Sequence, residues 1–167
     1  MSATTFEYDA FVPHPIDAVW KAMRRTSDLD VLGGQKVDER ISDSEWVCVD
    51  GETRNHCVAT YDEATHTVTV TEESTAKHTD DTTVISARAA ENGTNVHIET
   101  TITGGFIVRA LLKLIGKAGI NKASESIVSN ITAICEGREP SVLSTEEINA
   151  FVKQRVAELH GTDDDEK

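Results

Sequence analysis

The chain has 167 residues, 38% of them hydrophobic, which is enough for the core of one domain and far below membrane composition. Its formal net charge of -13 repels phosphate backbones, and the few Lys and Arg residues are spread out, which excludes nucleic acid as a partner. The sequence does not open on a basic and apolar leader, and no stretch reaches the roughly 18 apolar residues that span a bilayer. We expect a cytoplasmic protein without an integral membrane segment.

The first predicted elements are a strand and two short helices. The run TTFEYDAFVP (4–13) alternates apolar and polar residues and ends in proline, which predicts a strand. Pro15 then suits the first position of a helix, whose apolar face carries Ile16, Val19, Trp20 and Met23. The run TSDLDVLGG (26–34) offers a capping residue and a closing glycine pair, which predicts a second short helix.

Six further strands follow in succession. Alternating runs at 35–42, 44–50, 52–62, 66–74, 82–91 and 94–103 are separated by short turns: Asp50-Gly51, the run DEAT (62–65) and Asn92-Gly93. Connections this short join antiparallel neighbours, so we expect one meandering sheet.

The turns also predict which residues face each other. Around Asn92-Gly93, Ala87 falls opposite Ile98, and around DEAT, Asn55 falls opposite Glu72. All three turns place the apolar residues on one face and the threonines on the other. The apolar face includes small residues, among them Ala87 and Ala89. Either a helix packs closely over these alanines or a cavity remains above them.

A long helix and a shorter one close the sequence. Residues 106–138 keep apolar residues, including Leu111 and Ile115, at helical spacing, and a bend is expected near Gly116 and Gly119. After Pro140, the pair Ser144 and Glu147 forms a capping box that predicts a separate amphipathic helix. We expect a ligand-binding domain at 1–138, an extension helix at 139–160 and a disordered acidic tail at 161–167.

The order of these elements resembles the helix-grip architecture of the START/Bet v 1-like superfamily, in particular its bacterial polyketide cyclase/dehydrase-like (SRPBCC) branch. The resemblance covers about residues 4–138 and is carried by FEYDAFVPHPIDAVWKAM, VATYDEATHTVTVTEES and FIVRALLKLIGKAGINKASESIVSNITAIC. It implies an α+β fold in which a curved antiparallel sheet of about seven strands wraps around a long C-terminal helix. It also implies a cavity for a hydrophobic or amphipathic small molecule between sheet and helix.

The superfamily shares no catalytic motif, so candidate residues come from the inward face. We expect the ligand to be lined by Tyr8, Asn55, Tyr61, Glu72, Ala87, Ala89, Ile98, Thr100, Leu111 and Ile115. Thr83 also faces inward beside Glu72. A carboxyl group in a poorly hydrated pocket has a raised pKa and can act as a general acid or base. Glu72 could instead hydrogen-bond a ligand, or reach water at the strand end.

Metals and cofactors are not expected. Cys48, Cys57 and Cys135 form no C-x-x-C pair. His56 and His97 fall three strands apart, about 14 Å at the usual strand spacing. Zinc ligands lie only about 2 Å from the metal, so these histidines cannot share one ion. The glycine pairs at 33–34 and 104–105 match no phosphate-binding loop.

Three functions fit the sequence. The first is the binding of a lipid-like or aromatic, polyketide-like molecule in a cavity. The second is a cofactor-independent enzyme of the cyclase/dehydratase kind. The third is an interaction module whose C-terminal helix docks on a partner or on a second copy in a homodimer.

Overall fold

The computed structural model describes residues 2–29, 36–50, 53–74, 79–141 and 145–161. These residues form seven strands and four helices in the order β1 (Ser2–Val12), α1 (Ile16–Met23), α2 (Thr26–Leu29), β2 (Lys36–Ser42), β3 (Glu45–Asp50), β4 (Thr53–Asp62), β5 (Thr67–Ser74), β6 (Thr79–Ala90), β7 (Gly93–Gly104), α3 (Phe106–Cys135) and α4 (Thr145–Gly161). The α+β class is confirmed.

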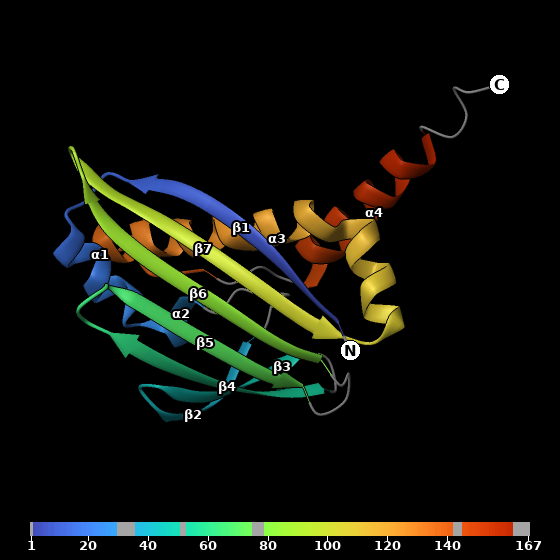
Figure 1. Ribbon diagram of the computed structural model, residues 1–167, viewed down its shortest axis with the longest axis horizontal. Coiled ribbons are helices and arrows are strands. Elements are labelled where there is room, and N and C mark those ends of the chain that lie inside the picture. Colours follow the sequence, from blue (N-terminus) through green and yellow to red (C-terminus); the bar gives the residue numbers. More distant parts are fainter. Residues whose placement is uncertain (1, 30–35, 51–52, 75–78, 142–144, 162–167) are drawn as a thin grey trace.

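All seven strands belong to one antiparallel sheet, in the order β1-β7-β6-β5-β4-β3-β2. The predicted meander from β2 to β7 is confirmed. The first strand closes the other end of the sheet, because β1 pairs with β7 along its whole length, from Ser2 opposite Gly104 to Val12 opposite Thr94. The sheet curves around its helices (Figure 1).

The predicted pairing of β6 with β7 was wrong by two residues. Ala90 pairs with Gly93, so Glu91 and Asn92 form the turn, and Asn92 takes the positive φ of 63°. Gly93 belongs to β7 instead, where a Cβ would lie 2.4 Å from the carbonyl oxygen of Val12. The glycine therefore serves the close approach of β1. Ala87 consequently faces Val96, not Ile98.

The β4–β5 pairing was also displaced by two residues. Asp62 pairs with Thr67, and its carboxylate accepts the backbone N–H groups of residues 64 and 65 at 3.0 and 3.3 Å. Glu72 therefore faces Cys57, while Asn55 faces Ser74. Because side chains alternate with a period of two, both displacements leave every residue on its predicted face.

Two short helices were expected after β1, but only α1 has more than one turn. Its buried side is formed by Val19, Trp20, Ala22 and Met23. α2 is a four-residue turn, fastened by the Thr26 hydroxyl, which donates to the Met23 carbonyl at 2.8 Å. The glycines expected to close α2, at positions 33 and 34, lie outside the described residues.

The long helix α3 bends at Gly116, as predicted, where the backbone leaves helical geometry (φ 7°, ψ -114°). Its first turns stand at the end of the sheet, and the rest runs along the sheet toward α1 (Figure 1). Beyond α3, Asn130 holds the chain by donating to the Ser141 carbonyl at 2.7 Å and accepting the Ser141 N–H at 2.9 Å. α4 follows at the predicted place, while the tail from residue 162 lies outside the described residues.

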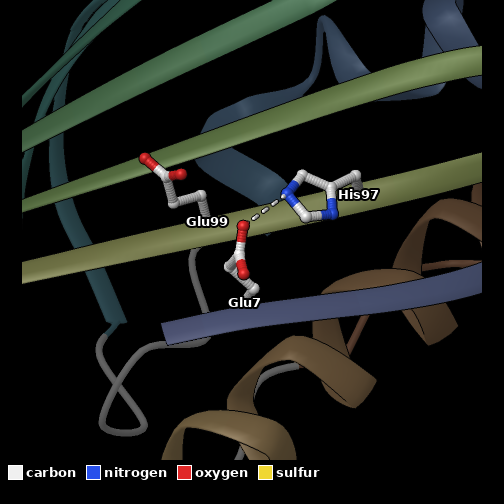
Figure 2. Close-up of side chains that lie close together, drawn as sticks. All are labelled: Glu7, His97 and Glu99. Carbon is white, nitrogen blue, oxygen red and sulfur yellow. Dashed lines mark ion pairs between the residues drawn. The ribbon is translucent and has the colours of Figure 1, made fainter. Parts of the chain in front are cut away.

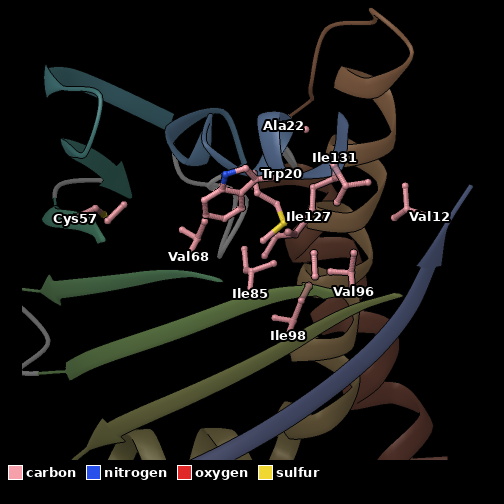
Figure 3. Close-up of a cluster of buried hydrophobic side chains, with 14 of the residues drawn as sticks. Val12, Trp20, Ala22, Cys57, Val68, Ile85, Val96, Ile98, Ile127 and Ile131 are labelled. Atoms are coloured by element: carbon pink, nitrogen blue, oxygen red, sulfur yellow. The ribbon is translucent and has the colours of Figure 1, made fainter. Parts of the chain in front are cut away.

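The core lies between the inner face of the sheet, α1 and the second part of α3. Figure 3 shows Trp20 of α1 and Ile127 and Ile131 of α3 beside Ile85 and Ile98 of the sheet. Ala87 is 2% exposed and belongs to this core, so a helix packs over this alanine. Ala89, two residues further along β6, is exposed.

The two alanines provide a test of this packing. Ala87→Trp overfills the core and should lower the free energy of unfolding by about 1–3 kcal/mol or more. Ala89→Trp should change it by no more than about 0.5 kcal/mol, because the added ring remains in water. Urea denaturation of both variants measures the difference. Equal stabilities would mean that the space above Ala87 is a cavity.

Candidate functional site

Buried polar side chains cross the inner face of the sheet at the end away from α1. Asn55 of β4 faces Ser74 of β5, and Thr83 of β6 faces Thr100 of β7. Glu72 of β5 lies between these pairs, diagonal to Asn55 and to Thr83. All five side chains are buried. We call them the inner polar band.

Two atoms of the inner polar band have no hydrogen-bond partner within the described part of the protein. They are the amide oxygen Oδ1 of Asn55 and the hydroxyl oxygen Oγ1 of Thr83, on residues that are 3% and 4% exposed. Leaving a buried polar group unpaired costs about 1–3 kcal/mol, so nearly all such groups in native proteins have partners. Strands β4 and β6, on either side of β5, thus each present an unused polar atom to the inner face.

The bend of α3 lies next to this band. A Cβ at Gly116 would lie 3.9 Å from the ring of Phe6, and Phe6 pairs with Thr100. The inner face is thus divided into an apolar part packed under α1 and the second part of α3, and a polar part close to the bend.

Three of the predicted site residues, Asn55, Glu72 and Thr100, belong to the inner polar band. Ser74, their neighbour, was not predicted, although it continues the alternation that places Glu72 inward. Ile98 belongs to the packed core with Ala87.

Tyr8 lies at the β1 edge of the inner face, where it is partly buried and pairs with Ile98. Burial raises the pKa of the Tyr8 phenol above its ordinary value of 10.0, and the nearby carboxylate of Glu125 raises it further. Both effects favour the neutral phenol.

Tyr61 lies away from the inner polar band and connects α1 to the sheet. Its hydroxyl is 3.3 Å from the carbonyl oxygen of Arg24 and 3.1 Å from that of Asp43. Its ring meets the ring of Trp20 edge to face, with centroids 6.5 Å apart. These contacts give Tyr61 a structural role at this end of the sheet.

The remaining predicted site residues do not face the inner polar band. Ala89 is exposed because neither α1 nor α3 extends over it, and Leu111 is exposed because it lies before the bend of α3. The side chain of Ile115 lies outside the described residues. The sequence indicated the face of each residue, but not how far the helices cover that face.

An open pocket of about 610 Å³ lies at the α1 end of β6. It is lined by inward residues Ala87 and Ala89 and also by Ser86 and Arg88, which point to the opposite face. Residues from both faces of β6 therefore line this pocket. It is therefore distinct from the space between the sheet and α3.

The outer face carries a cluster that the spacing of histidines did not predict. Pairing of β1 with β7 brings Glu7 and Asp9 beside His97 and Glu99. Figure 2 shows His97 directed toward Glu7, with Nε2 and Oε1 3.7 Å apart, and Nδ1 of His97 is 2.7 Å from Asp9 Oδ1. Glu7, His97 and Glu99 could each offer a metal one ligand atom, all within 4.8 Å of one another. The ion pairs of His97 already account for this arrangement.

Sequence comparisons give no family assignment. No protein-family model matches the chain. No curated protein matches it either.

Solved structures do match, over most of both chains. The Zhui aromatase/cyclase of a Streptomyces species is 15% identical, with a TM-score of 0.60, covering 85% of this chain and 100% of its own. A Thermus thermophilus protein is 15% identical, with a TM-score of 0.61, covering 80% and 98%. Norcoclaurine synthase of Thalictrum flavum is 12% identical, with a TM-score of 0.56, covering 81% and 96%. At 12% to 15% identity, these similarities establish the fold alone: the chain has the helix-grip architecture that it shares with these structures.

Proposed function

We propose that the protein binds a hydrophobic or amphipathic small molecule between the inner face of the sheet and α3. The observation that carries this proposal is the pair of buried, unpartnered atoms in the inner polar band, Asn55 Oδ1 and Thr83 Oγ1. A ligand would supply their missing partners, while its apolar part would contact the neighbouring core. The proposed binding region is centred on the inner polar band, with Tyr8 at its β1 edge.

The chemistry of the two atoms limits the ligand. An amide oxygen only accepts hydrogen bonds, whereas a threonine hydroxyl both donates and accepts. A ligand hydroxyl can therefore satisfy either atom. Asn55 and Thr83 lie two strands apart, about 10 Å, and four residues apart along β5, about 13 Å, so each needs its own polar group on the ligand. A ligand carboxylate is disfavoured, because it would add a further carboxyl group beside buried Glu72, which already faces Asp81 across the strands. We infer an apolar molecule that carries alcohol or phenol groups.

The structural neighbours support small-molecule binding by analogy. Two of them are named for reactions of small molecules, one as an aromatase/cyclase and one as norcoclaurine synthase. At 15% and 12% identity, their substrates do not transfer to this chain.

One observation favours catalysis as a second candidate function. Glu72 places a buried carboxyl group within the inner polar band, next to the two unpartnered atoms. A carboxyl group held against a bound molecule can move a proton during a cyclisation or dehydration, and such a reaction needs no cofactor. Binding without turnover of any copurified molecule would leave the protein a binder.

Thr83→Val tests the binding site. Valine keeps the shape of threonine and removes a buried hydroxyl that has no partner, so stability should stay equal or rise by about 1 kcal/mol. Ligand affinity should fall by roughly tenfold, since one hydrogen bond of about 1.4 kcal/mol is lost. The ligand is identified by native mass spectrometry of protein purified from its own host, and its affinity is measured by titration calorimetry.

The matched control is Thr82→Val on the opposite face of the same strand. It makes the same chemical change and should leave affinity unchanged. The proposal would be contradicted if the two variants bound the ligand with equal affinity. It would also be contradicted if no molecule copurified with the protein and no hydrophobic dye bound to it.

Glu72→Gln tests the carboxyl group of the band. The change keeps the shape of the side chain and replaces an oxygen by an N–H donor, so ligand affinity should change severalfold while the fold persists. Glu73→Gln, on the exposed face one residue later, removes the same charge and should have no effect. Calorimetry with the copurified molecule compares the two. If both variants bind like the wild type, Glu72 lies outside the binding site.

Tyr8 can report on occupancy of the space beside it. In the free protein its phenol should titrate above pH 10, because burial and Glu125 both raise its pKa. Since the unfolded chain ionises first, Tyr8 contributes stability below about pH 10 that is lost as the pH rises through the folded-state pKa. A bound apolar molecule should raise this pKa further.

The measurement is the tyrosinate absorbance of the wild type minus that of Tyr8→Phe, with and without a hydrophobic dye. Glu125→Gln should lower the midpoint but leave it above 10, because burial is the larger cause. A midpoint that the bound dye does not move would place Tyr8 outside the site.

A further inference from the structure

The first turns of α3 expose large apolar side chains to solvent. Phe106 is 84% exposed and Ile107 is 81% exposed, and Leu111 and Leu114 are about half exposed at 50% and 46%. We call residues 106–114 the projecting segment. Figure 1 shows it at the end of the sheet, before the bend at Gly116.

The projecting segment is apolar on two sides. One side, with Val108 and Leu112, is partly buried against the domain, and a Cβ at Gly104 would come within 2.8 Å of Val108. At 3.6 residues per turn, Ile107, Leu111 and Leu114 lie together on a second side, about 100° around the helix from Val108 and Leu112. Among the described residues, α4 does not cover them: its Phe151 contacts Lys122 beyond the bend, with the ammonium 5.6 Å from the ring centroid.

The charge of this region is opposite to that of the whole chain. The chain carries a net charge of -13, yet no Asp or Glu occurs between Glu99 and Glu125. Within that run, Arg109 and Lys113 are one helical turn apart, and Lys117 follows just after the bend. By helical spacing, the first two lie together on the polar side of the segment, about 160° around the helix from Ile107 and Leu111.

We propose that the projecting segment docks on an anionic membrane surface. A helix that pairs an outward apolar side with Lys and Arg residues on its polar side suits the interface, where the apolar residues enter the lipid boundary and the cations meet anionic headgroups. Among the described residues, no helix is long and apolar enough to cross a bilayer.

Charge favours this occupant over a second copy of the chain. A symmetric dimer through the same surface would pair two segments that each carry Arg109 and Lys113 and no carboxylate, so it would offer these cations no opposite charge. An anionic bilayer instead supplies many opposite charges and a place for Phe106 and Ile107. The argument uses only this surface and does not rest on the proposed ligand site.

Cosedimentation of the full chain with vesicles tests the docking. The protein should bind vesicles of phosphatidylcholine with phosphatidylserine, bind far less to phosphatidylcholine alone, and dissociate as salt screens the charges. The double variant Phe106→Ser with Ile107→Ser should lose affinity for the mixed vesicles by roughly tenfold or more, because two large apolar side chains are removed. The double variant Arg109→Gln with Lys113→Gln should also bind weakly.

The control is Ile41→Ser, which removes an apolar side chain that is 51% exposed on β2. It should bind vesicles like the wild type. Unchanged melting temperatures and dye binding would show that the segment variants are folded and keep the ligand site. The proposal is overturned if the wild type does not bind the mixed vesicles. It is also overturned if the apolar double variant binds them as well as the control, or if that variant instead dissociates a dimer seen by sedimentation velocity.

Discussion

The arrangement of the molecule depends on how helices cover the inner face of a wide, curved sheet. Seven strands present more apolar surface than one straight helix can shield, and unshielded apolar surface loses about 25 cal/mol for each Å² left in water. α1 and the part of α3 after Gly116 cover one part of the inner face of the sheet, where Trp20, Ile85 and Ile131 form the core. The bend at Gly116 then turns the first part of α3 away from the direction of the sheet.

The inner polar band lies where this apolar packing ends. Each unpartnered atom in it opposes folding by about 1–3 kcal/mol, whereas a domain is stable by only about 5–15 kcal/mol in total. Two such atoms, on Asn55 and Thr83, therefore lower the free energy of unfolding of the ligand-free protein substantially. The proposed binding site would account for them, because groups that lack partners in the free protein would gain them from a ligand.

The sequence predicted which face each strand residue occupies better than it predicted which residues meet. Alternation is a local property, and an error of two residues in a turn does not alter it, so Glu72 and Asn55 were correctly placed inward. Their pairing depended on the turns, and Gly93 was needed for contact with Val12 instead of for the turn. The exposure of Ala89 and Leu111 depended on where helices end and bend above the sheet. Tertiary packing decides this, and strand periodicity carries no signal for it.

The inner polar band and the projecting segment lie at the same end of β7. Thr100 belongs to the band, and Gly104, four residues later, contacts the segment through Val108. Four residues of extended strand span about 13 Å, so a bilayer under the segment would lie within one amphipathic molecule's length of the band. Gly116 joins the two regions, since α3 passes over Phe6 at the bend. The proposed ligand site and the proposed membrane contact are therefore neighbours at this bend.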